Sequence, residues 1–216
     1  MNRLTYFCIF LIFSSFVIAQ NTLTPDQSLE ELKAGNKRFI SGEFSTKNYM
    51  AEVEETAHGQ NPYAVIVTCS DSRLPAEIIF DESIGKLFVI RLAGNVVDSA
   101  ALGSIEYAVK YLNSSYILML GHTHCGAVHA VVGGGSYSPS ITALAKKIVP
   151  AFENVKLKNV DEEDLLEETI EENVHLQLKV ISSMSEIVST RVAEGTVKIG
   201  GGVYDISTGK IHFLED

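Results

Sequence analysis

Residues 64–73 read AVIVTCSDSR, an apolar run that ends in a cluster of reactive side chains. Residues 116–126, YILMLGHTHCG, show the same arrangement. Each apolar run has the length and β-branched content of a strand buried in a parallel sheet. Because open α/β sheets bind ligands at the carboxyl ends of their strands, we expect both clusters at one edge of the sheet.

Cys69, His122 and Cys125 form a candidate ligand set for zinc. Two thiols and an imidazole suit Zn²⁺, which accepts sulfur, nitrogen and oxygen donors in a tetrahedron. Three protein ligands leave a fourth position open, which is typical of a catalytic rather than a structural zinc site. Asp71 either takes that fourth position and closes the site, or stays off the metal.

Asp71 and Arg73 are expected to act as a pair. In an extended segment, residues two apart point the same way, so Cys69, Asp71 and Arg73 can share one side. Arg73 can hold the carboxylate by a bidentate contact, which lowers its pKa and keeps it off the metal. Asp71 would then accept a hydrogen bond from zinc-bound water or hydroxide. An ordinary ion pair at the end of a strand is the alternative.

Residues 1–19 differ from the rest of the chain. Arg3 is their only charge, Phe7 to Phe13 is an unbroken apolar run, and small residues lead up to Ala19. This pattern indicates a secretory signal peptide, so we expect an exported protein, periplasmic in a Gram-negative bacterium and otherwise secreted. An uncleaved membrane anchor is the alternative, but the run is short for a span of about 20 residues.

Cleavage after the signal peptide changes both the charge and the cysteine content. The net charge goes from −10 to −11, and Cys8 is lost. Such an acidic chain is a poor binder of nucleic acid or anionic lipid, so we expect neither as a partner. Cys69 and Cys125 remain, and an exported protein can join two cysteines in a disulfide. The charged and imidazole neighbours of both cysteines favour zinc instead.

Strands alternate with helices through the mature chain, which predicts an α/β fold in one catalytic domain of residues 20–216. The central sheet should be mostly parallel, flanked by helices, with an N-terminal helix outside it and a C-terminal β-hairpin. The acidic segment 161–172 is interpreted as a solvated helix face, with a cation-binding or partner surface as the alternative. Expected strands are residues 64–67, 87–90, 116–120, 197–205 and 210–214. Expected helices are one that starts at Thr24-Pro25-Asp26 and carries its apolar stripe over 28–39, then 50–57, 76–80, 99–112, one that opens at 125, and a long helix that continues from the acidic segment through 174–188.

The two motifs resemble the signature of the β-class carbonic anhydrases, Cys-x-Asp-x-Arg followed by His-x-x-Cys. They stand roughly fifty residues apart, and the resemblance extends from about Leu29 to Val192. It implies one zinc per chain on Cys69, His122 and Cys125. The implied reaction is the reversible hydration of CO₂ to bicarbonate and a proton, by attack of zinc-bound hydroxide. Hydrolysis of CS₂ or COS on the same scaffold, or non-catalytic binding of zinc or an anion, are the alternatives.

The same resemblance implies the surroundings of the metal. Asp71 and Arg73 match the catalytic dyad. In the plant-like members of the family, a neighbouring subunit supplies part of the pocket, so a homodimer or higher homo-oligomer is expected. The plant-like pattern also implies an open site near neutral pH, with water as the fourth ligand. The implied substrate-binding residues are Gln60, Phe88, Tyr107 and Gly126.

Four positions qualify this interpretation. Core packing is the alternative role for the aromatic pair Phe88 and Tyr107. Leu92 stands where many members of the family have Asn. His124 lies between two ligands and is expected to face solvent or to lie just outside the ligand set, with a proton shuttle as the alternative role.

The signal peptide generates a direct prediction. Protein isolated from its native host should begin near Gln20 and be found outside the cytoplasm, because the small residues before it suit signal cleavage. N-terminal sequencing of native material measures this, and a chain that begins at Met1 would contradict export by this route.

Overall fold

A computed structural model describes residues 23–214, and the signal peptide expected at 1–19 lies outside them. Its centre is a five-stranded sheet in the order β2-β1-β3-β4-β5. The first four strands run parallel, and the last is antiparallel to its neighbour. The expected mostly parallel α/β sheet with a C-terminal hairpin is therefore confirmed. The strands are β1 (Ala64–Thr68), β2 (Leu87–Arg91), β3 (Tyr116–His122), β4 (Lys198–Tyr204) and β5 (Ile211–Phe213).

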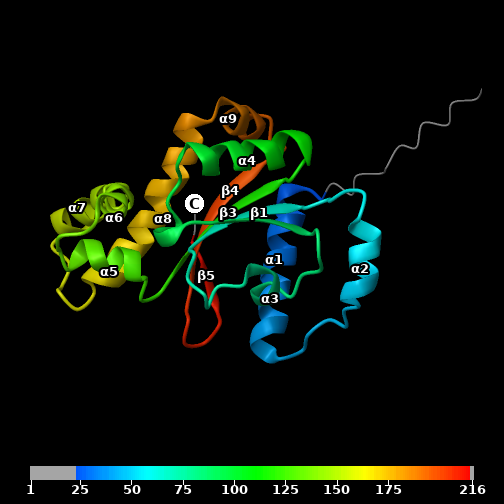
Figure 1. The fold of residues 1–216 in the computed structure, drawn as a ribbon, viewed down its shortest axis with the longest axis horizontal. Helices are drawn as coiled ribbons and strands as arrows, with labels where there is room; N and C mark the ends of the chain where they lie inside the picture. The colour runs from blue at the N-terminus through cyan, green and yellow to red at the C-terminus, as the bar shows by residue number, and fades with distance from the viewer. Residues whose placement is uncertain (1–22, 215–216) are drawn as a thin grey trace, which may run out of the picture.

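Helices cover both faces of the sheet (Figure 1). Helices α4 and α9 lie on one side and α1 and α3 on the other, while α5, α6 and α7 gather beside one end of α8. In the described part of the chain, no helix is long and apolar enough to cross a membrane. The helices are α1 (Pro25–Ser41), α2 (Tyr49–Thr56), α3 (Ala76–Ile79), the 3-10 turn η1 (Ala93–Asn95), α4 (Ser99–Tyr111), α5 (Gly126–Val132), α6 (Pro139–Ala145), α7 (Val149–Leu157), α8 (Leu165–Met184) and α9 (Glu186–Ala193).

Strands β1 and β3 are buried along their whole length. Because side chains alternate across a strand, Ile66 and Leu118 pack into a cluster with α1 and α3. Val67 and Met119 pack into a second cluster with α4, α8 and α9 on the opposite face. Burial on both faces explains why these strands read as continuous apolar runs.

The N-terminal helix α1 begins and ends where its sequence requires. Thr24 and Gln27 form a capping box, and Gly42 ends the helix in a left-handed conformation. Gly35 lets the helix approach the end of α3, since a Cβ there would lie 1.8 Å from the Phe80 carbonyl oxygen. The helix start expected at Thr24-Pro25-Asp26 is confirmed, and the helix ends at Ser41, shortly after the apolar stripe that ends at Phe39.

The region after residue 133 differs most from expectation. The pattern did not predict helices α6 and α7. The long helix expected to continue from the acidic segment through 174–188 is present as α8, but its unbroken run to residue 188 is wrong. Helix α8 ends at Met184, and Ser185 starts the separate helix α9, where its hydroxyl oxygen accepts from the Val188 amide at 3.2 Å. The same hydroxyl donates to Glu106 on α4 at 2.6 Å. The Ser185 hydroxyl therefore caps α9 and also bonds to the distant helix α4. This interrupts an apolar stripe that is continuous in the sequence.

Candidate metal centre

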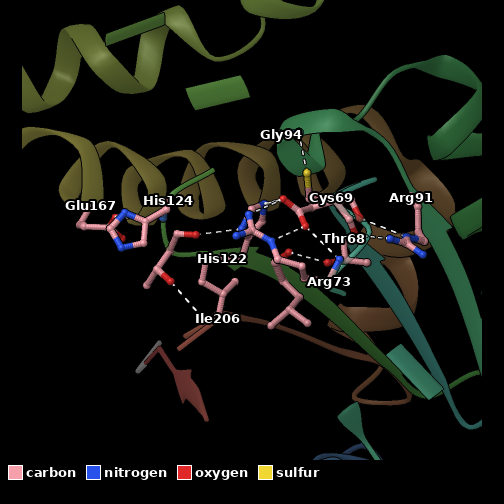
Figure 2. Close-up of polar contacts among 12 residues, drawn as sticks. Thr68, Cys69, Arg73, Arg91, Gly94, His122, His124, Glu167 and Ile206 are labelled. Atoms are coloured by element: carbon pink, nitrogen blue, oxygen red, sulfur yellow. Dashed lines mark hydrogen bonds and ion pairs between the residues drawn. The ribbon is translucent and has the colours of Figure 1, made fainter. Parts of the chain in front are cut away.

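The three expected ligands come from the carboxyl ends of two neighbouring strands. Thr68 pairs with Leu120 in the register of β1 and β3, so Cys69 leaves β1 beside the end of β3. His122 is the last residue of β3, and Cys125 precedes the first residue of α5. All three residues are buried, and their ligand atoms lie within 4.8 Å of one another. Figure 2 shows the Cys69 side chain and the His122 ring close together at this edge.

The His122 ring is oriented as a metal ligand. Its Nδ1 lies 3.0 Å from the Thr123 carbonyl oxygen, so Nδ1 donates there and Nε2 presents a lone pair to the two thiols. Within residues 23–214, Nε2 is the one buried side-chain nitrogen or oxygen without a hydrogen-bond partner. Because buried polar atoms are normally paired, this orphaned nitrogen fits a bound cation.

The two thiols also fit a divalent cation. Cys69 and Cys125 are free in the structure, so the expectation of thiols rather than a disulfide agrees with the described residues. A hydrogen bond between the thiols lowers the pKa of Cys69, against the opposing effect of burial. The same bond raises the pKa of Cys125. Without a metal, only one of two thiols this close together ionises, whereas Zn²⁺ stabilises both thiolates.

Asp71 and Arg73 form the expected bidentate pair. Arg73 donates from Nε to Asp71 Oδ1 at 2.9 Å and from Nη2 to Oδ2 at 2.7 Å. These bonds hold the pKa of Asp71 well below its usual range. Asp71 Oδ2 lies 4.0 Å from His122 Nε2, so the carboxylate adjoins the ligand set while both of its oxygens are bonded to Arg73.

The backbone conformation that brings Asp71 and Arg73 together differs from expectation. Residues 69–73 were expected to be extended, but Ser72 and Arg73 form a turn. The Arg73 amide donates to Asp71 Oδ1 at 3.0 Å, and the Leu74 amide donates to the Asp71 carbonyl at 3.1 Å. A carboxylate that bonds the backbone two residues on favours such a turn, which an argument from strand periodicity misses.

Arg91 is a contact of the centre that the sequence did not single out. It ends β2 and pairs in register with Thr68. Its Nε donates to the Cys69 carbonyl at 3.2 Å, and its Nη2 donates to the Asp71 carbonyl (Figure 2). Arg91 therefore ties the segment that carries a ligand and the dyad to the neighbouring strand. The sequence signal that could have identified Arg91 was its place at the carboxyl end of an expected strand.

The four expected substrate-binding residues do not all lie together. Gly126 directly follows the ligand Cys125. The rings of Phe88 and Tyr107 are 6.3 Å apart, but Phe88 pairs with Val65, four residues or about 13 Å along the strand before Cys69. Gln60 precedes the amino end of β1, which is the opposite end from Cys69.

Phe88 and Tyr107 differ in their exposure, because Phe88 is partly buried and packs against the second core cluster, as the core-packing alternative required. Tyr107 is 47% exposed, so core packing does not account for it. Within one chain, the structure therefore leaves Gln60, Phe88 and Tyr107 apart from the ligand set.

His124 faces solvent, as expected. Its side chain is 72% exposed, and its backbone amide donates to Glu167 at 3.0 Å. Glu167 belongs to the acidic segment 161–172, in which most of the acidic side chains are exposed, in agreement with a solvated face. Leu92, the departure from the family pattern, is partly buried against both core clusters.

The geometry generates a prediction about metal content. About one zinc per chain should copurify, and Cys69→Ser, His122→Ala and Cys125→Ser should each abolish tight binding, because three ligands cannot spare one. The control is His129→Ala, which removes an exposed imidazole on α5 outside the ligand set.

Zinc analysis by atomic emission after gel filtration measures this content. Full occupancy in a protein with both Cys69→Ser and Cys125→Ser would rule out the assigned ligands. A disulfide between these two cysteines in active protein would do the same.

Comparisons with known proteins agree with this geometry. Residues 64–211 match the carbonic anhydrase family. Carbonic anhydrase 2 of Mycobacterium tuberculosis is 37% identical over 194 residues, which cover 86% of this chain and 91% of that protein. The solved β-carbonic anhydrase CcaA has a TM-score of 0.70 at 28% identity and covers 87% of this chain and 95% of its own.

A second solved structure extends the comparison. A tetrameric β-carbonic anhydrase of Sordaria macrospora has a TM-score of 0.70 at 26% identity, covering 88% of this chain and 94% of its own. The family match spans both motifs, the strands that carry them and the helices between them. The chain therefore belongs to the β class of the carbonic anhydrase family, zinc enzymes that reversibly hydrate carbon dioxide to bicarbonate.

Proposed function

We propose that this chain hydrates CO₂ at an open zinc centre in which Arg73 holds Asp71 off the metal. The observation that carries the proposal is the bidentate contact, in which both oxygens of Asp71 are already bonded. Cys69, His122 and Cys125 would hold the zinc, which activates a water molecule as the nucleophile. A fourth position free of protein then remains for that water.

The residues around the metal would divide the remaining work. Asp71 is ionised at neutral pH and can accept a hydrogen bond from the reacting water, which orients it. Arg73 fixes the carboxylate in place and is half exposed, so it reaches the solvent side of the centre. Gly126 offers a backbone amide beside Cys125, a position suited to an oxygen of the substrate.

Two alternatives remain as outcomes of an assay. A COS or CS₂ hydrolase would use the same ligands, and the relatives named carbonic anhydrase favour CO₂ instead. A non-catalytic zinc protein needs neither Asp71 nor Arg73, so the intact dyad favours an enzyme. Comparing CO₂ hydration with COS and CS₂ hydrolysis on one preparation separates all three.

The dyad generates a kinetic prediction. Arg73→Ala should lower kcat for CO₂ hydration by at least about a hundredfold, because it frees Asp71 to move to the metal. Asp71→Asn should keep zinc yet lose the anionic acceptor, with a loss in the same direction. Since Arg73 lowers the pKa of Asp71, the pair stays ionised above about pH 4, and changes in activity near neutral pH should follow another group.

Stopped-flow CO₂ hydration measures these changes, with zinc content checked for each variant. Arg191→Ala is the control, since it removes a partly exposed arginine with a loose 3.8 Å ion pair to Glu194 near the amino end of the sheet. Near-normal turnover in Arg73→Ala would contradict the role given to the dyad.

We also propose that a second copy of the chain completes the substrate pocket. Gln60, Phe88 and Tyr107 lie apart from the ligands of their own chain, and β2 is an edge strand of the sheet. Exposed apolar side chains extend over the end of α1 and over α2, which suits an interface. The tetrameric relative from Sordaria macrospora supports assembly. The exposed apolar residues in this region are Ile40, Phe44, Tyr49, Met50 and Val53.

This assembly predicts a homodimer or higher homo-oligomer in solution. Light scattering at the concentration used for assays should give at least twice the chain mass. If Gln60 acts across the interface, a mixture of Gln60→Ala and His122→Ala chains should recover activity that neither variant has alone, because some sites then combine intact partners. A fully active monomer would contradict the shared pocket.

We further propose export of a mature catalytic domain of residues 20–216. The support is the charge and apolar pattern of residues 1–19. In a Gram-negative host, this places the activity in the periplasm.

A further inference from the structure

Gly94 makes a direct contact with a zinc ligand. Its backbone N–H donates to Cys69 Sγ at 3.3 Å, as Figure 2 shows. Gly94 and Asn95, both in η1, adopt the left-handed conformation with φ of 69° and 45°. A Cβ on Gly94 would lie 2.7 Å from Ile148 Cδ1, so only glycine fits here without displacement. A buried turn in this conformation needs support from outside itself.

That support comes from two buried amide side chains on α8. Asn173 Nδ2 donates to the Gly94 carbonyl at 2.9 Å. Gln177 Nε2 donates to Asn173 Oδ1 at 3.1 Å, and Gln177 Oε1 accepts from the Val97 amide at 2.9 Å. Asn173 and Gln177 are 0% and 1% exposed. The amides thus connect η1 and the residues just after it to one face of α8.

The close packing of α8 against the sheet determines where these two amide side chains lie. Val174 packs onto Gly121 of β3 and Gly201 of β4, where a Cβ on either glycine would lie 2.8 Å from a Val174 methyl group. This close approach holds the adjacent Asn173 at the level of η1. The bonds of Asn173 and Cys69 engage the carbonyl and the amide of the same residue, Gly94, so together they fix its orientation.

We propose that Asn173, supported by Gln177, is a positioning residue that holds the Gly94 N–H on the Cys69 sulfur and thereby slows loss of zinc. An N–H directed at a thiolate offsets part of the negative charge of two neighbouring thiolates and fixes the direction of the sulfur lone pairs. Loss of a hydrogen bond to a metal ligand commonly lowers metal affinity by about 10- to 100-fold. The inference rests on the proposed zinc centre and assigns no step of the reaction to Asn173.

The test is Asn173→Leu, which keeps a similar volume but removes the donor to Gly94. The matched control is Thr169→Val, since Thr169 is equally buried one turn earlier on α8 and donates within the helix to Leu165. Zinc release from purified holoenzyme to a chromogenic chelator should be about tenfold faster in Asn173→Leu. Thr169→Val should release zinc at the wild-type rate.

A spectroscopic measurement separates positioning from a general loss of stability. In cobalt-substituted protein, the sulfur-to-cobalt charge-transfer band should move to lower energy in Asn173→Leu, because a thiolate without its N–H donor is easier to oxidise. The band should not move in Thr169→Val.

The outcomes are separable. Release and spectrum equal to the control in folded Asn173→Leu would overturn the proposal. If that variant does not fold, Gln177→Leu decides, with faster release and a shifted band expected and wild-type behaviour of both overturning it. Absence of zinc from the wild-type protein would instead overturn the zinc centre itself.

Discussion

The parallel pairing of β1 with β3 is the constraint on which the centre depends. Thr68 and Leu120 are partners in the register, and the Thr68 hydroxyl donates to the Leu120 carbonyl at 3.0 Å at the last step of the shared ladder. Cys69 and His122 therefore emerge side by side although they are far apart in sequence. A slip of one residue would turn every side chain of β1 to the opposite face and carry Cys69 away from His122. Because both strands are buried on both faces, such a slip would also disrupt the core.

Charge balance explains why the centre can exist in a buried place. Two thiolates match the charge of one zinc ion, and Asp71 is matched by Arg73, so the arrangement has no large net charge to bury. Hydrogen bonds with backbone and side-chain groups then hold these residues in place. The Thr123 carbonyl orients His122, and Arg91 ties down the carbonyls of Cys69 and Asp71. The metal ligands are therefore held from three strands and from α8, and no single loop determines their geometry.

The sequence predicted the parts of this structure that depend on local pattern. The buried strands, the three ligands and the dyad follow from apolar runs and the residues just after them. The turn at residues 72–73 was missed, because the side chain of Asp71 bonds the backbone and overrides strand periodicity. The break at Ser185 was missed for a related reason, since a hydroxyl that caps α9 also bonds Glu106, 79 residues away. Arg91 and Asn173 act through contacts 22 and 79 residues away, which no periodic pattern encodes.

Whether Asp71 stays with Arg73 when the metal is bound decides how the enzyme works. The direct measurement is a crystal structure of the zinc-loaded protein at about pH 7.5, far above the usual pKa of an aspartate. We predict that Asp71 keeps both bonds to Arg73 and that a water molecule takes the fourth position on zinc. An Asp71 oxygen bonded to the zinc, with Arg73 turned away, would contradict the open centre.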